Sequence, residues 1–381
     1  MKSAILSGHS AMSKESLKSL IGGFPRYLCS YLPTPLERMQ NLSNRLGGVN
    51  LFVKRDDQTG LAFGGNKARK LDFIMADVLA QKCDSVITWA GVQSNWCRQT
   101  AAAARKVGIK PILILFKRPN LPADTDGNLF IDLLFDSEVK IVEVESGKNI
   151  MELGEIGEFI EEVAEAERRK GNNPYIAPIG GSMTEGSMTK PLGAISFVNA
   201  FLEILEQTQT QNVKPDYIIL ATGSGSTQAG LMVGARLVSP NTKVVGITVS
   251  EDKRAMEHCV ETIAEQTFKE FGAANSGKEG VIVFDDYVKD GYGILNEETA
   301  RALRLVAETE GILLDPVYTG RAMVGLIDLI EKGYFKKDDN VVFWHTGGTP
   351  ALFPYREKIL DYLEDVPARR QSRCHHRRRF G

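Results

Sequence analysis

Lys67 is the first residue of this chain whose type and position could support catalysis. It follows Asn66 and two glycines in the segment 53–79, and it stands at the opening of an amphipathic helix. A cation there faces the positive end of the helix dipole, which lowers its pKa and leaves more free amine. A free amine can form a Schiff base with a carbonyl group. A lysine at a helix start is also commonly an ordinary solvated side chain, which is what we expect of Lys70, one turn further on.

A second candidate site is the turn that contains Gln93, Ser94 and Asn95. It follows a predicted strand and opens an alanine-rich helix within 89–108. Ser94 or Asn95 would cap this helix whatever the protein does. The backbone amides of the turn also form an anion site, which suits the carboxylate of a small substrate. The turn therefore predicts a helix cap, with substrate binding as the functional alternative.

A glycine-rich turn, LATGSGSTQAGLMVGARL (220–237), connects a predicted strand to a predicted helix. Its backbone N–H groups and hydroxyls can surround a phosphate. Glu251, after the next strand, lies where a dinucleotide-binding fold carries its ribose-binding acid. However, the third glycine of that pattern is missing. The hydroxyl groups of the turn suit a phosphate monoester better than a pyrophosphate, which favours pyridoxal phosphate over NAD. These hydroxyls belong to Thr222, Ser224, Ser226 and Thr227.

Two later turns carry a tyrosine and a histidine. Tyr318 lies in GILLDPVYTGRAMVGL (311–326) and His345 in VVFWHTGGTPALF (341–353), and each segment is an apolar run broken by turn residues. A tyrosine in such a run is commonly a core residue with one satisfied hydroxyl. We expect a structural role for His345 as well. The two turns become candidates for chemistry only in combination with the sites before them.

The elements that must position these residues predict an α/β fold. Apolar runs alternate with segments of helical period, which is the pattern of parallel strands covered by helices. One series has strands at 84–89, 111–116 and 140–144 and helices at 66–82 and 94–107. A second series has strands at 216–221, 243–249 and 341–344 and helices at 226–238, 252–272, 297–309 and 321–332.

Between the two series, the segment 177–194 is rich in Gly, Ser and Met, which favours a domain crossing or an active-site loop. We place a domain boundary near residue 184. The end of the chain, 368–381, carries six arginines and two histidines with almost nothing to bury, so we expect residues 366–381 to be disordered.

The composition favours a soluble, cytoplasmic protein with a small-molecule function. The 381 residues are 43% apolar and 25% charged, enough for two packed domains. A net charge of −2 argues against nucleic acid as a partner. No apolar run approaches the roughly 20 residues that span a membrane, and the first residues lack the apolar stretch of a secretory signal. The five cysteines are scattered and never spaced C-x-x-C, so neither disulfides nor a metal site are expected.

The blocks GGNKARKL, GVQSN, GSGSTQAGL, DPVYTG and HTGGTPALF occur together and in this order. From about Leu32 to Tyr355 the chain resembles the family that contains 1-aminocyclopropane-1-carboxylate deaminase and D-cysteine desulfhydrase. The resemblance implies the tryptophan synthase β-like fold (fold type II), with open, mainly parallel sheets and helices on both faces, and a homodimer. It also implies a large domain of residues 1–67 and 184–365, a small inserted domain of 68–183, and pyridoxal phosphate in the cleft between them.

The resemblance assigns roles residue by residue. Lys67 would be the Schiff-base lysine, and Asn95 the partner of the cofactor's phenolic oxygen. Tyr318 and Tyr292, the latter in the DGYG turn at 290–293, would approach the reacting carbons. The phosphate would be held by Thr222, Gly223, Ser224, Gly225, Ser226 and Thr227. The substrate would be bound by Gln93, Ser94, Asn95 and Trp96.

Two threonines help to choose an activity within that family. Thr319 and Thr346 match the desulfhydrase pattern, whereas the deaminase pattern would have glutamate and leucine there. A neutral hydroxyl near the pyridine nitrogen gives a weaker electron sink, which still permits β-elimination. The resemblance thus favours D-cysteine desulfhydrase over the deaminase. Trp96 stands where histidine is usual in desulfhydrase-like members, so D-serine, β-chloroalanine, cysteate and 2,3-diaminopropionate stay open as substrates. A nucleotide-dependent oxidoreductase or a non-catalytic binding protein remains a third alternative.

Overall fold

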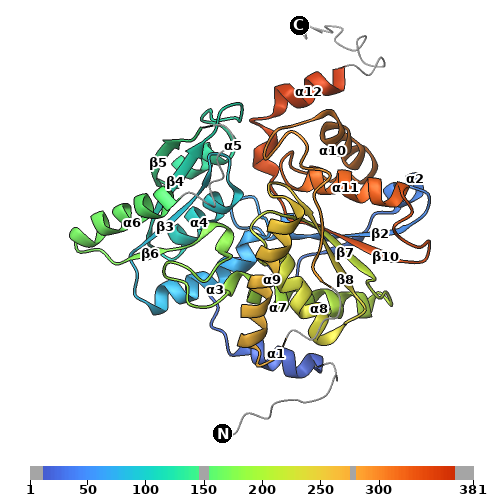
Figure 1. The fold of residues 1–381 in the computed structure, drawn as a ribbon, viewed down its shortest axis with the longest axis horizontal. Coiled ribbons are helices and arrows are strands. Elements are labelled where there is room, and N and C mark those ends of the chain that lie inside the picture. Colours follow the sequence, from blue (N-terminus) through green and yellow to red (C-terminus); the bar gives the residue numbers. More distant parts are fainter. Residues whose placement is uncertain (1–11, 146–153, 275–279, 365–381) are drawn as a thin grey trace, which may run out of the picture.

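The computed structural model describes residues 12–145, 154–274 and 280–364. Its strands form two sheets that lie side by side, with the four-stranded sheet on the left of Figure 1 and the six-stranded sheet on the right. Helices cover both faces of this pair of sheets, and the strands are mainly parallel. The predicted α/β fold class is confirmed.

The six-stranded sheet has the order β1-β2-β10-β7-β8-β9. Strand β1 is antiparallel to β2, and every other neighbouring pair is parallel. The strands are β1 (Leu36–Arg38), β2 (Asn50–Arg55), β10 (Asn340–His345), β7 (Tyr217–Thr222), β8 (Lys243–Thr248) and β9 (Ile282–Phe284). Near-continuous apolar runs form these strands because both faces of the sheet are covered.

The four-stranded sheet has the order β5-β4-β3-β6 and is parallel throughout. Its strands are β5 (Glu138–Glu143), β4 (Lys110–Lys117), β3 (Ser85–Gly91) and β6 (Pro174–Ile176). All four come from one continuous part of the chain, and the six-stranded sheet is built from the segments before and after it. The division into domains at residues 68 and 184 follows this separation of the sheets and stays a prediction.

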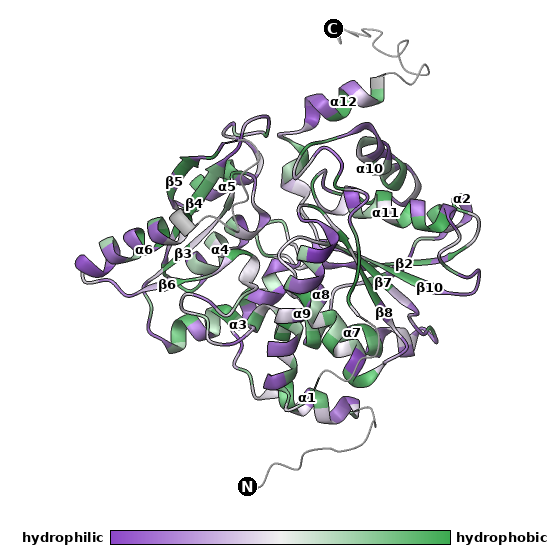
Figure 2. Ribbon diagram, viewed as in Figure 1, coloured by the Kyte–Doolittle hydropathy of each residue, from purple (hydrophilic) through white to green (hydrophobic). Residues whose placement is uncertain are grey.

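The helices fill the connections between strands and cover the sheets. They are α1 (Lys14–Gly22), α2 (Gln40–Arg45), α3 (Lys67–Ala80), α4 (Asn95–Lys106), α5 (Gly127–Leu134), α6 (Gly154–Arg169), α7 (Leu192–Thr210), α8 (Ser226–Val238), α9 (Lys253–Glu270), α10 (Glu297–Glu310), α11 (Thr319–Glu331) and α12 (Arg356–Glu364). Short 3-10 turns are η1 (Asp56–Gln58), η2 (Ile179–Gly181) and η3 (Thr349–Leu352). Figure 2 shows hydrophobic residues along the strands and many hydrophilic ones on the outlying helices α6 and α12.

Helices α7 and α8 pack closely beneath the six-stranded sheet. A Cβ atom on Gly230 of α8 would lie 2.2 Å from the carbonyl oxygen of Ala194, and one on Gly234 would lie 2.7 Å from Cβ of Phe201. Both α8 positions therefore need glycine, because any side chain would push α7 away. This contact fixes the place of α8, whose first residues belong to the glycine-rich turn.

The strands and helices predicted from the sequence are confirmed, and none of their ends differs by more than two residues. The strands β1, β2, β6 and β9 and the helices α1, α2, α5, α6, α7 and α12 were not predicted. The basic tail, 366–381, lies outside the described residues. Among the helices that the structure describes, none is long and apolar enough to cross a membrane.

Candidate functional site

A cavity of about 440 Å³ lies at the carboxyl ends of strands from both sheets. Its lining includes residues at or just after the ends of β3, β7, β8 and β10, which is where open parallel sheets bind ligands. Most of the side chains proposed from the sequence meet here: Lys67, Ser94, Asn95, Trp96, Thr222, Gly223, Ser224, Gly225, Thr227, Tyr292, Tyr318 and Thr346. Gln93, Ser226 and Thr319 are not among the lining residues.

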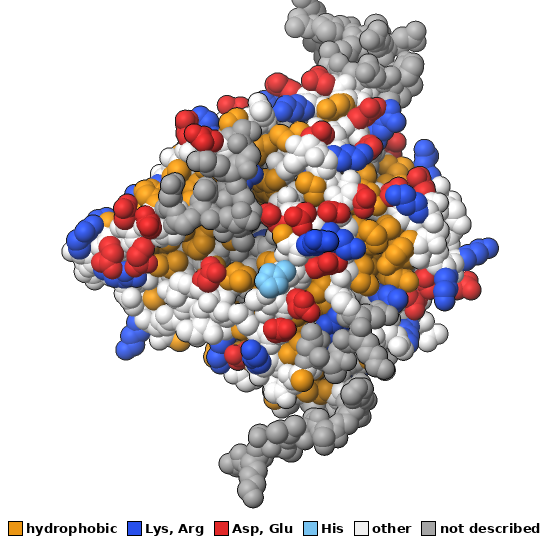
Figure 3. Space-filling model, viewed as in Figure 1, with side chains coloured by type: hydrophobic (Ala, Val, Ile, Leu, Met, Phe, Trp, Pro, Cys, Tyr) orange, Lys and Arg blue, Asp and Glu red, His pale blue; other side chains and the backbone are white. Residues whose placement is uncertain are grey.

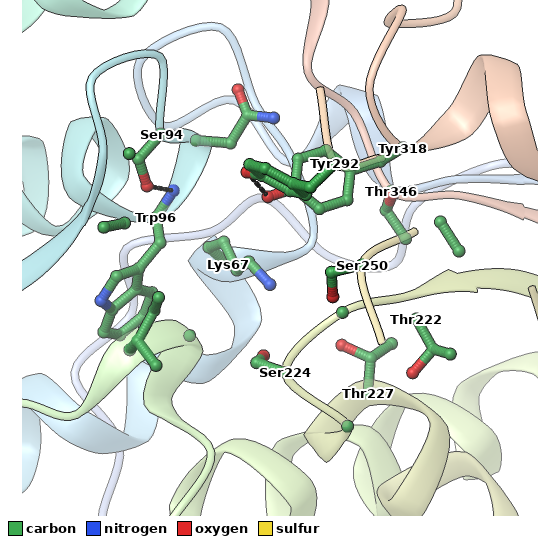
Figure 4. A pocket seen from close by; sticks show the side chains of 18 of the residues that line it. Lys67, Ser94, Trp96, Thr222, Ser224, Thr227, Ser250, Tyr292, Tyr318 and Thr346 are labelled. Carbon is green, nitrogen blue, oxygen red and sulfur yellow. Dashed lines mark hydrogen bonds between the residues drawn. The ribbon is translucent and has the colours of Figure 1, made fainter. Parts of the chain in front are cut away.

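Lys67 is the first residue of α3, and its side chain extends into the centre of this cavity (Figure 4). Burial lowers its pKa to about 8, although a hydrogen bond with Lys70 acts in the opposite direction. The lowered pKa agrees with the expectation from the helix start, but burial is its main cause. At pH 7 roughly a tenth of Lys67 is therefore free amine, and at pH 8 about half is.

Lys70 is not the ordinary solvated lysine that we predicted. It is fully buried, and its Nζ donates to the carbonyl oxygen of Gly180 at 2.9 Å and to Oγ of Ser226 at 2.7 Å. Burial and the nearby Lys67 lower its pKa well below the usual range. The prediction failed because α3 is enclosed on both faces, by α4 and by α7. Lys70 instead ties α3 to the start of α8.

The glycine-rich turn forms one end of the cavity, where Thr222, Ser224 and Thr227 lie together in Figure 4. Helix α8 starts at Ser226 after Gly225, whose φ of 81° is a left-handed conformation that favours glycine. No side chain caps α8, and the N–H of Ser226 donates to the carbonyl oxygen of Ser224 at 3.0 Å. The N–H groups that follow, beginning with that of Thr227, can meet an anion at the positive end of the helix. This end of the cavity fits a phosphate group.

Ser226 itself faces away from the cavity. Its hydroxyl accepts the hydrogen bond from Lys70 and lies 3.0 Å from Oγ of Ser182. The role proposed for its side chain at the phosphate is thus not supported by the geometry, while Thr227 lines the cavity and accepts a hydrogen bond from Nδ2 of Asn66 at 3.1 Å.

Ser94 caps α4, as its position before an alanine-rich helix predicted. Its Oγ accepts from the backbone N–H groups of Trp96 and Cys97, both at 3.2 Å. Because the oxygen accepts both bonds, the hydroxyl proton of Ser94 remains available to a group in the cavity.

The side chain of Gln93 is engaged outside the cavity, although we expected it near a substrate carboxylate. Its Nε2 donates to the carbonyl of Asp126 at 3.0 Å, and its Oε1 accepts from the N–H of Asn128 at 2.9 Å. Helix α5 therefore holds this glutamine.

Trp96 borders the cavity on the side opposite Thr346 (Figure 4). Its indole is buried, and Nε1 donates to Oγ1 of Thr88 at 2.6 Å. That hydrogen bond fixes the plane of the ring, so Trp96 presents a rigid apolar surface to any ligand. The indole N–H has no second proton to donate.

Tyr292 and Tyr318 form a pair above Lys67, with their hydroxyl oxygens 2.6 Å apart (Figure 4). Burial raises the pKa of both phenols, and that of Tyr318 most strongly. Both hydroxyls are therefore protonated across the physiological range, and one of the two can donate into the cavity.

Thr319, which follows Tyr318, is not part of the cavity wall. Its hydroxyl donates to Oδ1 of Asp315 and accepts from the backbone N–H of the same residue, both at 2.7 Å. The neighbouring turn places Thr346 in the cavity wall instead. His345 is fully buried and accepts from the N–H of Gly347 through Nδ1, which supports the structural role expected for it.

Arg118, Ser250 and Glu251 also line the cavity. The sequence did not single out Arg118 or Ser250, and it marked Glu251 only as a possible ribose-binding acid. Arg118 directly follows β4 and lies over the ring of Tyr292, 5.8 Å from its centroid. Ser250 and Glu251 follow β8. The signal that could have found them is their position after parallel strands, where side chains from several strands converge.

The arrangement defines a class of protein: an α/β enzyme with a reactive amine and a phosphate-sized anion site in one cavity. The chain belongs to the family of pyridoxal-phosphate dependent enzymes, whose model matches residues 30–347. The cavity fits this cofactor, since Lys67 can react with its aldehyde and the uncapped start of α8 can hold its phosphate.

Similar proteins agree with this assignment. A Pyrococcus furiosus protein named for 1-aminocyclopropane-1-carboxylate deaminase is 37% identical over 347 residues, which cover 91% of this chain and 99% of the relative. D-cysteine desulfhydrase of Klebsiella pneumoniae is 39% identical over 339 residues, which cover 88% of this chain and 98% of the relative. The crystal structure of an ACC deaminase homologue matches with a TM-score of 0.81 and 34% identity, covering 91% of this chain and 99% of that one. Tomato threonine deaminase isoform 2 shares the fold, with a TM-score of 0.61 and 17% identity over 95% of this chain and 92% of that one.

Proposed function

We propose that this protein is a D-cysteine desulfhydrase, which converts D-cysteine and water into pyruvate, hydrogen sulfide and ammonia. The observation that carries the proposal is the position of Lys67 between the start of α8 and the Tyr292–Tyr318 pair (Figure 4). A β-elimination needs a base at the α-carbon and a proton donor at the leaving group, and these side chains can provide both.

Pyridoxal phosphate would supply the electron withdrawal that makes the α-proton acidic. Lys67 would hold the cofactor and, once released as a free amine, would accept that proton. The protonated tyrosine pair would donate to the departing sulfur. Ser94 would donate its remaining hydroxyl proton to the substrate carboxylate, which would also meet the positive end of α4.

The choice of β-elimination over ring opening is supported by Thr346, a neutral hydroxyl in the cavity wall, together with the 39% identity to a D-cysteine desulfhydrase. Thr319 contributes less than its sequence position suggested, because Asp315 holds its hydroxyl. The 1-aminocyclopropane-1-carboxylate deaminase reaction is the alternative, and the Pyrococcus furiosus relative is named for it.

The test is release of sulfide and pyruvate from D-cysteine by the purified yellow protein, beside L-cysteine, D-serine and 1-aminocyclopropane-1-carboxylate. Lys67→Ala is the blank. Sulfide that appears from D-cysteine and disappears with Lys67 would establish the function. A yellow, Lys67-dependent protein that opens the cyclopropane ring instead would replace our proposal with the deaminase.

Trp96 is the residue most able to change the substrate preference, because it is the bulky rigid side chain at the cavity wall. Trp96→His should alter the ranking of D-cysteine against D-serine, β-chloroalanine, cysteate and 2,3-diaminopropionate, since it removes apolar volume and adds a group that can carry a proton. The kcat/KM of each substrate measures this ranking. An unchanged ranking would show that the indole only packs.

We further propose that the protein is cytoplasmic, as the sequence composition favours, and that it is a homodimer, as the resemblance implies. Sedimentation equilibrium should give about twice the chain mass of 42.0 kDa. A mass of one chain would contradict this.

A further inference from the structure

Asn128 is a buried residue of α5 that does not line the cavity but contacts two residues of the turn before α4. Its Nδ2 donates to the carbonyl oxygen of Gln93 at 2.8 Å and to Oδ1 of Asn95 at 3.0 Å. Its backbone N–H donates to Oε1 of Gln93 at 2.9 Å. Three hydrogen bonds therefore connect Asn128 to the turn that carries Asn95.

The backbone carbonyl of Gln93 determines how the side-chain amides of Asn128 and Asn95 are oriented. A backbone carbonyl can only accept, so the atom of Asn128 that faces it must be the NH₂ group. The atom of Asn95 that faces the same NH₂ group must then be its oxygen. The amide nitrogen of Asn95 is left on the opposite side, where a Cβ on Gly348 would lie 3.0 Å from it, in the turn that also carries Thr346.

We propose that Asn128 is a positioning residue, which holds the Asn95 carboxamide so that its N–H groups, and not its oxygen, face the cofactor. The inference rests on the proposed function, in which Asn95 contacts the phenolic oxygen of pyridoxal phosphate. An isolated asparagine could rotate its amide by half a turn and present either atom. The bond from Asn128 removes that freedom.

The orientation has a measurable consequence in the colour of the bound cofactor. When the Schiff-base nitrogen loses its proton, the phenolic oxygen keeps a negative charge that needs an external donor. A donor from Asn95 stabilises this unprotonated form and so lowers the pH at which the absorbance changes. Loss of the correctly oriented donor should raise that midpoint by about one pH unit, the shift expected for a hydrogen bond to a charged group.

The experiment is a pH titration of the absorbance of the purified holoenzyme. Asn128→Leu removes the donor, and Asn128→Asp reverses the polarity so that the oxygen of Asn95 turns towards the cofactor. Asn95→Ala removes the target, and the double variant with Asn128→Leu tests whether the two act together. Asn173→Leu is the matched control, because Asn173 also donates to backbone carbonyls but lies outside the cavity.

We expect Asn128→Leu, Asn128→Asp and Asn95→Ala each to raise the midpoint, the control to leave it unchanged, and the double variant to match Asn95→Ala alone. If Asn95→Ala shifts the midpoint and neither Asn128 variant does, Asn128 has no positioning role and the proposed function stands. If Asn95→Ala has no effect, Asn95 is not the phenolic partner and the inference fails with that assignment. If Asn128→Leu does not fold, the smaller Asn128→Ala, which also removes the donor without adding a charge, takes its place in the same comparison.

Discussion

Lys67 and Lys70 are separated by one turn of α3, and burial lowers the pKa of both amines. Only Lys67 reaches the cavity, while Lys70 donates to Gly180 and Ser226 behind it. Their proximity disfavours two charges at once, because like charges in a poorly solvated region repel strongly. The pH at which Lys67 loses its proton therefore determines whether the cavity contains a nucleophilic amine.

Capture of pyridoxal phosphate by the cofactor-free protein should depend on pH through Lys67. Its lowered pKa of about 8 means that free amine, the reactive form, increases as the pH rises through 8 and is lost below it. Stopped-flow absorbance should give a second-order rate constant that rises roughly tenfold per pH unit below pH 8 and levels off above it. A constant that keeps rising to pH 10 would show an unperturbed lysine.

Lys70→Met should weaken cofactor binding without removing Lys67, the proposed Schiff-base lysine. The substitution leaves the carbonyl of Gly180 and the hydroxyl of Ser226 without their donor, at a cost of about 1–3 kcal/mol. Because Ser226 opens α8, we expect the dissociation constant of pyridoxal phosphate to rise by roughly tenfold or more. Lys82→Met, an exposed lysine just beyond the same helix, is the control and should match the unmodified protein.

The sequence predicted which turns border the cavity, but it did not always predict which of their side chains point into it. Gln93, Ser226 and Thr319 were expected in the cavity because their neighbours in the same motifs lie there. Gln93 and Ser226 instead bond to partners from distant segments, Asn128 and Lys70. Thr319 bonds to Asp315 within its own turn. A motif fixes where a turn lies, but which side chain points inward depends on contacts that one sequence does not display.

At the scale of elements, continuous apolar runs predicted the central strands well. Helix α7 was not predicted, although 19 residues form it, because its buried face extends almost all round and leaves no clear periodicity. Its contact with α8 depends on glycines rather than on an apolar stripe. Helix α8 is also largely buried, but it was predicted because a glycine-rich turn marks its start. A fully buried helix therefore needs a signal at its end as well as periodicity.

Gly230→Ala tests the close packing of α7 and α8. The new methyl group would lie 2.2 Å from the carbonyl oxygen of Ala194, so the helices must separate. We expect a loss of about 1–3 kcal/mol in the free energy of unfolding, measured by urea denaturation. The same change at Gly157 of α6 meets nothing within 4 Å and should stabilise by about 0.5–1 kcal/mol.

The whole molecule combines two sheets around one cavity, and a buried ionic network ties the main elements together. Arg69 of α3 forms ion pairs of 2.8 Å with Asp56 after β2 and with Glu203 of α7, and Lys54 contacts the same glutamate at 2.5 Å. Figure 3 shows acidic and basic side chains interspersed on the visible face, without a continuous basic surface among the described residues. The fold class followed from the alternation of elements, whereas this network joins residues far apart in the chain and was not predictable.

Glu203→Gln should lower global stability in a pH-dependent way. Burial alone would raise the pKa of Glu203, but Arg69 and Lys54 hold it at about 2. A lowered carboxyl pKa contributes stability that is present above the usual value of 4.5 and is lost as the pH falls towards 2. We expect a loss of about 3 kcal/mol at pH 7 and a smaller difference near pH 3, both measured by urea denaturation. Glu206→Gln, on the exposed side of α7, is the control and should leave the free energy of unfolding unchanged at both pH values.

Trp96 is also an intrinsic fluorescent probe of the cavity. Of the three tryptophans, Trp96 alone lines the cavity. Trp344 donates to Asp56 in the core, and Trp89 packs against an apolar cluster of the four-stranded sheet. Indole emission overlaps the absorption of pyridoxal phosphate, which we propose binds at Lys67. Excitation energy would pass to the bound cofactor, so the emission of Trp96 would fall as the site fills. Arrival of the cofactor could therefore be followed in real time on the unlabelled protein.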